Sequence, residues 1–143
     1  MNLDAFKQAL VASTAHMFSW DEMETEGKST VMRTFFRTRG YDDGIKTFVE
    51  LDPEGMLVVT FVFDNIEYTK DTLKLVNFFN ENVYFLKAFI KKGYDVNRLT
   101  IEFANPGCKS VDEACEQVQI AFQILSADST ITHLRPLTIL TEE

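Results

Sequence analysis

The chain has 143 residues, of which 45% are apolar and 13% aromatic, so it is long and apolar enough for one domain with a hydrophobic core. Its formal net charge of −8 argues against binding to nucleic acid or to an anionic membrane, since both depend on clustered lysines and arginines. No apolar run approaches the roughly 18 residues needed to span a bilayer, and no secretion signal is recognisable, so we expect a cytoplasmic protein.

The predicted elements begin with a helix, because apolar residues recur at helical spacing between Leu3 and Phe18 and Asn2 can serve as the N-cap. The acidic segment from Trp20 to Gly27 is interpreted as a connector. A second helix is predicted from Ser29 to Gly40, where four apolar residues fall on one side: Val31, Met32, Phe35 and Phe36. Together these form a predicted N-terminal helical segment, residues 1–40.

Beyond residue 40 the apolar pattern changes to alternation, which is typical of strands. Strands are predicted from Ile45 to Leu51 and from Met56 to Phe63, joined by a turn at Asp52-Pro53-Glu54-Gly55. A short third strand is predicted around Ile66 to Tyr68. The second strand is apolar on both faces apart from Thr60, so either both faces are covered or one face meets a partner.

The next predicted elements are a helix from Lys70 to Asn82 and strands from Val83 to Lys91 and from Arg98 to Ala104. A final helix begins with a capping box at Ser110 and runs to about Ala127. Strands joined by tight turns pair antiparallel, so the sequence predicts an α+β domain whose helices pack on one face of a sheet of about five strands.

The C-terminal tail, residues 128–143, is apolar but contains Pro136, which disfavours a long helix. We expect an extended, partly docked segment there. The predicted organisation is therefore a single domain over residues 1–143, with the helical segment first, the sheet and helices over residues 41–127, and the tail last.

Two short segments carry a family resemblance. Leu75-Val76-Asn77-Phe78-Phe79-Asn80 resembles the Leu-Val-Asn-x-x-Asn segment on the middle helix of YbjN-like proteins, and Phe85-Leu86-Lys87-Ala88 resembles a strand start of that family. The element order over Ser29 to Ala127 is similar to the wider group that shares the type III secretion chaperone fold. The first predicted helix is an addition to this pattern.

The resemblance implies a curved antiparallel sheet in α-β-β-β-α-β-β-α order with helices on one side. Secretion chaperones bind unfolded stretches of partner proteins as dimers, and YbjN-like proteins are described as regulators. The resemblance therefore implies a noncatalytic module that binds protein rather than an enzyme.

Asn77 and Asn80 lie three residues apart, so they share one face of the predicted helix, next to apolar positions. Amides on an apolar stripe need hydrogen-bond partners. One explanation is that they bond to loop or strand backbone and fix the helix on the sheet. The other is that they anchor a ligand or a peptide backbone.

Surplus apolar residues indicate a further contact. Ile120 and Ile124 fall on the side of the final helix opposite its core face, one turn apart, and Val58 and Val62 share a face of the doubly apolar strand. Either the C-terminal tail covers the isoleucines or another subunit does. We take these four residues as the candidate interaction surface and expect a homodimer, with a polypeptide as a further partner.

No catalytic motif, cofactor motif or metal-ligand spacing is found in the sequence. Cys108 and Cys115 lack CxxC spacing, and His16 and His133 have no Glu or Cys at ligand spacing. The first functional hypothesis is accordingly a chaperone-like or adaptor-like protein-binding module without a cofactor. The alternative is a small-molecule-binding regulatory domain with a pocket between sheet and helices, in which Asn77 and Asn80 are the polar anchors.

Overall fold

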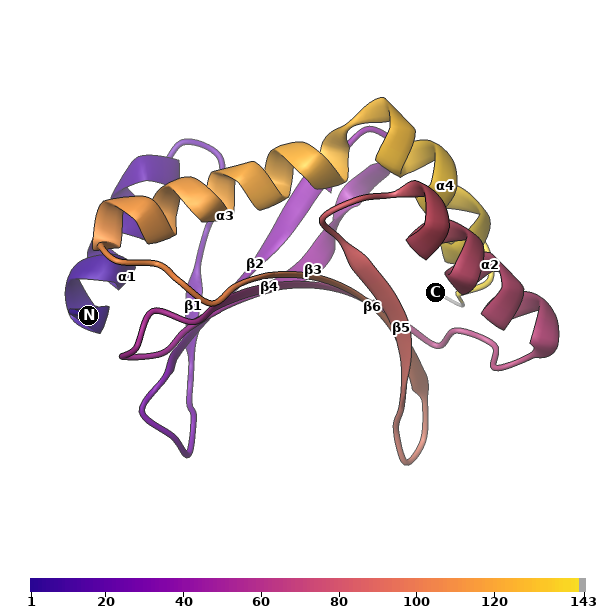
Figure 1. The fold of residues 1–143 in the computed structure, drawn as a ribbon, viewed down its shortest axis with the longest axis horizontal. Coiled ribbons are helices and arrows are strands. Elements are labelled where there is room, and N and C mark those ends of the chain that lie inside the picture. Colours follow the sequence, from indigo (N-terminus) through magenta and orange to yellow (C-terminus); the bar gives the residue numbers. More distant parts are fainter. Residues whose placement is uncertain (142–143) are drawn as a thin grey trace.

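The computed structural model describes residues 1–141, which form an open six-stranded antiparallel sheet and four helices (Figure 1). The elements follow one another as α1 (Leu3–Thr14), β1 (Asp21–Met23), β2 (Thr30–Thr38), β3 (Tyr41–Leu51), β4 (Leu57–Asp64), α2 (Lys70–Asn82), β5 (Lys87–Lys92), β6 (Asn97–Asn105), α3 (Val111–Ser126) and α4 (Asp128–Thr138). The order of strands across the sheet is β1-β2-β3-β4-β6-β5. The predicted α+β class is confirmed.

The sheet is an arch, and all four helices lie on its convex side (Figure 1). Helix α3 runs over the top of the arch, α1 lies beside it at the end near β1, and α2 and α4 lie at the end near β5 (Figure 1). No described helix covers the concave face, which is open between the two down-turned ends of the sheet.

Strand β4 shows why one face is core and the other is not. Leu57, Val59 and Phe61 are fully buried against the helices, whereas the intervening Val58 and Val62 are half-buried on the concave face. Successive side chains of a strand point to opposite faces, so the alternation of burial follows from the pleat. The strand is central in the sheet, but among the described residues only its convex face is covered by helices.

Aromatic side chains hold α3 on the sheet. The ring of Phe122 stacks on that of Phe36 in β2, with centroids 4.7 Å apart and planes inclined by 12°. The same ring also contacts Phe18 and Phe61. Large aromatic side chains bury a large apolar area each, so this cluster anchors the helix layer.

The predicted helix from Ser29 to Gly40 is wrong, because residues 30–38 form β2. Thr30 and Thr34 point into the core together with Met32 and Phe36, and the real period is therefore two. Gly40, predicted to end a helix, is in the turn between β2 and β3 with a φ of +88°. The N-terminal segment 1–40 is thus one helix followed by two strands.

The predicted extended tail is also wrong over the part that the structure describes, since residues 128–138 form α4. Three of its apolar side chains are buried in the core: Ile131, Leu134 and Leu137. Pro136 lies two residues before the end of α4, so it does not divide a long helix, although its missing N–H removes one backbone hydrogen bond. The tail is docked, as expected, but as a helix; residues 142–143 lie outside the described range.

The remaining differences concern strand limits. Residues 66–68 form no strand, and Ile66 makes only an isolated bridge to Thr141. The segment predicted as an acidic connector contains β1. Strand β5 begins later than predicted, after Phe85, whose φ of +70° is incompatible with an extended strand. Helix α2 has the bounds that the sequence predicts.

The predicted α-β-β-β-α-β-β-α order is found in the structure, but different elements occupy its positions and two elements are added to it. Helix α1 takes the first place, followed by β2, β3 and β4, then α2, β5, β6 and α3. The N-terminal helix is therefore the first helix of the pattern, and the additions are β1 and α4.

Candidate functional site

The concave face of the sheet contains an open hollow of about 750 Å³, lined by side chains from β2 to β6. Its floor combines apolar side chains with threonines: Val31, Phe48, Thr60, Val62, Phe89 and Thr100. Thr100 of β6 is paired in register with Val62 of β4 on one side and with Phe89 of β5 on the other. The hollow therefore includes Val62 from the predicted interaction surface, and Val58 is on the same face of β4, two residues before Thr60.

Charged side chains at the hollow are segregated by sign. The basic residues gather near the ends of β4 and β5 and the start of β6: Lys46, which lies opposite Val62, and Lys91, Lys92 and Arg98. The acidic residues Glu50 and Glu102 lie farther along the strands, opposite Val58 and Thr60 of β4, and Lys87 of β5 is paired in register with Glu102. The hollow thus has a basic end, separated by its apolar floor from the end that carries its two acidic residues.

Asp64, the last residue of β4, links two of the basic side chains. Its Oδ2 lies 2.8 Å from Nζ of Lys46 and its Oδ1 lies 2.9 Å from Nε of Arg98. The hydrogen bond from Lys46, followed by that from Arg98, lowers the pKa of the Asp64 carboxyl against the opposing effect of burial. One carboxylate between two cations leaves an excess of positive charge at the basic end.

Ile120 and Ile124 are half-buried and line a different, smaller hollow of about 360 Å³. The other residues around it are Phe85, Phe103, Ala104, Asn105 and Gln117. Phe85 is 80% exposed and has a left-handed backbone conformation, which is rare for a bulky residue. We call the group Phe85, Ile120 and Ile124 the α3 patch. No charged side chain and no residue of α4 is among the described residues that line its hollow.

The two asparagines of α2 have different surroundings. The side-chain amide of Asn80 bonds to both the N–H and the carbonyl oxygen of Ala88 in β5. Asn77 is exposed, and its side chain makes no hydrogen bond with the part of the chain that the structure describes. The structure therefore brings Asn80 to strand backbone and does not bring the two amides together in one pocket.

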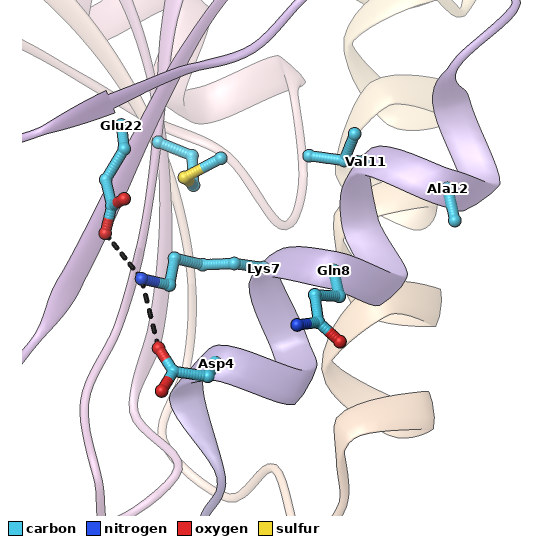
Figure 2. Close-up of a pocket in the computed structure, with 7 residues that line it drawn as sticks. Asp4, Lys7, Gln8, Val11, Ala12 and Glu22 are labelled. Carbon is cyan, nitrogen blue, oxygen red and sulfur yellow. Dashed lines mark hydrogen bonds and ion pairs between the residues drawn. The ribbon is translucent and has the colours of Figure 1, made fainter.

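A further hollow, of about 590 Å³, lies between α1 and the sheet edge at β1 and was not predicted from the sequence (Figure 2). Lys7 points from α1 toward Glu22 of β1 and forms ion pairs with Glu22 and Asp4. The hydrogen bond to Glu22, and after it the one to Asp4, raises the pKa of Lys7. The spacing of Asp4 and Lys7 on one helix face is visible in the sequence, whereas Glu22 is brought in by the fold alone.

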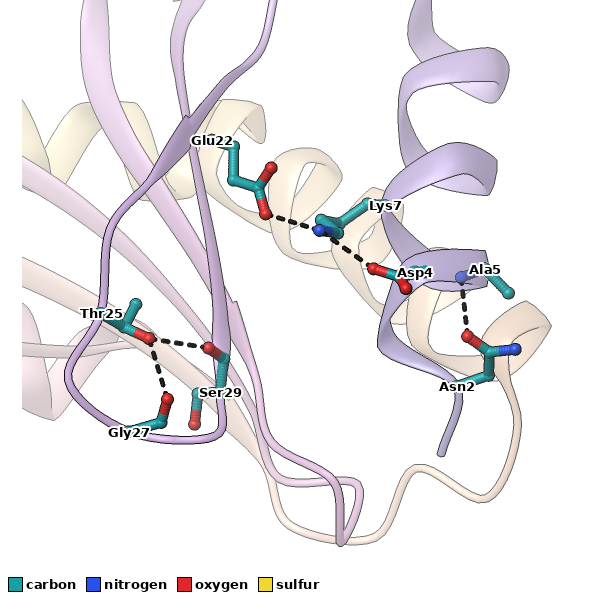
Figure 3. A network of polar contacts seen from close by, with 8 residues as sticks. All are labelled: Asn2, Asp4, Ala5, Lys7, Glu22, Thr25, Gly27 and Ser29. Carbon is teal, nitrogen blue, oxygen red and sulfur yellow. Dashed lines mark hydrogen bonds and ion pairs between the residues drawn. The ribbon is translucent and has the colours of Figure 1, made fainter.

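The surroundings of this ion-paired group are structural (Figure 3). Asn2 caps α1 by accepting the N–H of Ala5, and the hydroxyl of Thr25 bonds to backbone carbonyls in the loop between β1 and β2. Because the charges here are paired with one another, we interpret the cluster as a link between α1 and the edge strand.

Potential metal ligands and two free thiols are present among the described residues. Within residues 1–141 there is no group of three His, Cys, Asp or Glu side chains placed to hold a metal ion. Burial raises the pKa of both thiols, to about 11 for Cys115, which leaves them protonated at neutral pH. None of the helices in this part of the chain has the length and apolar character to cross a membrane.

The sequence matches no protein-family model and no curated protein. The resemblance to YbjN-like proteins and secretion chaperones therefore stays a prediction.

Proposed function

We propose that the protein is a noncatalytic polypeptide-binding module, chaperone-like or adaptor-like, that works as a homodimer. The observation that carries the proposal is the concave face of the sheet, which no described helix covers although its floor is largely apolar. Phe48, Val62 and Phe89 remain only half-buried there. Full burial of such side chains contributes about 1.5–3 kcal/mol each, so a covering polypeptide has a source of binding free energy.

Binding of this kind needs no special side-chain chemistry, because apolar burial and backbone pairing supply the affinity. That agrees with the lack of a catalytic motif in the sequence. The predicted resemblance to proteins that bind unfolded chains points in the same direction.

The homodimer is supported by the α3 patch. A chain with a net charge of −8 repels a copy of itself, and the repulsion is smallest where no charge lies at the contact. The hollow beside Ile120 and Ile124 is lined by uncharged residues. It is also where Phe85 holds an aromatic ring in solvent at the cost of backbone strain.

The alternative, a regulatory domain with a small-molecule pocket between sheet and helices, has less support. The side chains in that layer, such as Phe61 and Leu125, are fully buried. The amide of Asn80, one of the two predicted anchors, is already bonded to Ala88.

The test is an array of 12-residue peptides of varied composition, probed with labelled protein. We expect wild type to bind a subset, and the double variant Val62→Ser, Phe89→Ser to lose this binding while keeping its circular dichroism spectrum. The matched control is Val11→Ser with Met17→Ser, two exposed apolar residues of the α1 region. Equal binding by the two double variants, or no binding by wild type, would contradict the proposal.

A further inference from the structure

We infer that the concave hollow receives an extended polypeptide segment that is acidic at one end and apolar along the rest, with its carboxylates at the basic end. This inference rests on the proposed function and specifies the chemistry of the partner.

The charge of the hollow is opposite to that of the chain. The whole chain has 14 basic and 22 acidic residues, whereas the residues that line the hollow include four basic and two acidic ones. An acidic protein repels acidic segments over most of its surface, so the hollow is where such a segment would be attracted.

The basic end has capacity for further carboxylates. Lys46 and Arg98 share the single carboxylate of Asp64, and Lys91 lies directly opposite Arg98 on β5. Lys91 and Lys92 are exposed at the end of their strand. A ligand carboxylate placed among these side chains would gain charge-assisted hydrogen bonds that the protein itself does not complete.

The other end of the hollow sets the direction of the segment. Glu50 and Glu102 lie beside Val58 and Thr60, toward the start of β4, and Lys87 is paired in register with Glu102. Glu50, whose cross-strand neighbours Val31 and Val58 are uncharged, would repel a second acidic group, so the acidic residues of the partner belong at one end only. The distance from Val58 to Asp64 along β4 corresponds to about 20 Å of extended chain, or roughly six residues.

The same features disfavour a single-stranded nucleic acid. Its backbone carries a negative charge at every nucleotide, so phosphates would lie next to Glu50 and Glu102 as well as next to the lysines. The ring face of Phe89 is also partly occupied, because the ammonium group of Lys87 lies over it, 5.8 Å from the ring centroid.

The experiment compares 12-residue peptides with identical apolar residues in which three positions at one end are Glu, Gln or Lys. We expect the Glu peptide to bind wild type about tenfold more tightly than the Gln peptide at 50 mM salt, equivalent to about 1.4 kcal/mol. The preference should fall below about threefold at 0.5 M salt, where screening is strong. Fluorescence anisotropy gives the dissociation constants, and a 12-nucleotide oligothymidine is the nucleic acid arm.

Two double variants test whether the preference for the Glu peptide comes from the basic end of the hollow. Lys91→Gln with Lys92→Gln should reduce the Glu-over-Gln preference severalfold and leave Gln-peptide binding unchanged. Lys70→Gln with Lys74→Gln removes the same charge from exposed residues of α2. This control should leave the Glu-over-Gln preference and the Gln-peptide binding unchanged.

The possible results separate the inference from the proposed function. If the three peptides bind alike and Val62→Ser with Phe89→Ser still abolishes binding, the acidic partner is wrong and the polypeptide-binding function stands. If no peptide binds, both are wrong. If the oligothymidine binds more tightly than the Glu peptide, the hollow is a nucleic acid site and the inference is overturned.

Discussion

The side-chain amide of Asn80 pairs with both backbone polar groups of Ala88, accepting its N–H at 2.7 Å and donating to its carbonyl oxygen at 2.9 Å. Ala88 belongs to β5, the last strand at its end of the sheet. The amide therefore occupies hydrogen-bonding groups that another strand would otherwise use, and an unprotected edge of this kind promotes aggregation.

Replacing Asn80 should destabilise the fold. Asn80→Ala leaves two backbone groups of Ala88 without their partners, at an expected cost of about 1–3 kcal/mol in the free energy of unfolding. Asn77→Ala, three residues away on the same helix, removes a side chain without a hydrogen bond to the described residues and should change it by less than about 0.5 kcal/mol. Urea unfolding followed by circular dichroism measures both, and equal effects would contradict the structural role of Asn80.

Helix α4 is expected to be part of the core rather than an accessory. Leu134→Ala should cost about 2–5 kcal/mol, because this side chain is fully buried and its loss leaves a cavity. Ile139→Ala, just beyond the helix and 79% exposed, should cost less than about 0.5 kcal/mol. A Leu134→Ala variant with the thermal midpoint of wild type would show that α4 does not stabilise the sheet.

The α3 patch should determine the oligomeric state. Light scattering is expected to give a dimer mass for wild type and a monomer mass for Ile120→Glu with Ile124→Glu, since two buried charges would oppose the contact. Val11→Glu with Met17→Glu adds the same charge at exposed apolar residues elsewhere and should remain dimeric. A monomeric wild type removes the dimer from the proposal.

The ion pairs of Asp64 should make stability depend on pH. The pKa of its carboxyl is lower in the folded state than the usual value of 3.8, so the pairs stabilise the fold above that value and lose their effect as the pH falls through the folded-state pKa. The stability difference between wild type and Asp64→Asn should be constant near neutral pH and shrink below about pH 4. A carbon-detected NMR titration that gives Asp64 an unshifted pKa would contradict this.

Both thiols should be unreactive in the folded protein. Cys108 and Cys115 have raised pKa values, that of Cys115 to about 11, mainly because burial disfavours the thiolate. At pH 7.5 we expect slow labelling of both by a disulfide reagent, and fast labelling once the chain is unfolded in urea. Rapid labelling of either cysteine in the native protein would indicate an accessible thiolate.

The sequence predicts those elements whose apolar period is unambiguous. Helix α2 and strand β6 have clear periods of 3.6 and 2. Their predicted limits, and those of the almost uniformly apolar β4, agree with the structure to within one residue. Strand β2 was missed because Thr30 and Thr34 occupy core positions. When a polar residue type fills an inward position, the count of apolar residues no longer shows the true period, although β-branched threonines favour strands.

The candidate site could be predicted only in part, for a related reason. The apolar character of β4 indicates an exposed face, and Val62 does line the hollow. The basic end, in contrast, brings together Lys46, Arg98 and Lys91 across four neighbouring strands, β3, β4, β6 and β5, and such neighbours are set by strand order and register. The pairing of β4 with β6 rather than with β5 cannot be inferred from local patterns.

That pairing also affects how the protein folds. Strands β2, β3 and β4 follow one another through tight turns and pair with their neighbours in sequence, so they can form early. Val62 and Phe89 come to lie on either side of Thr100 only when the hairpin of β5 and β6, which follows α2, pairs with β4. The hollow exists only in the completed sheet, so a partner that binds there also selects for, and stabilises, the fully folded chain.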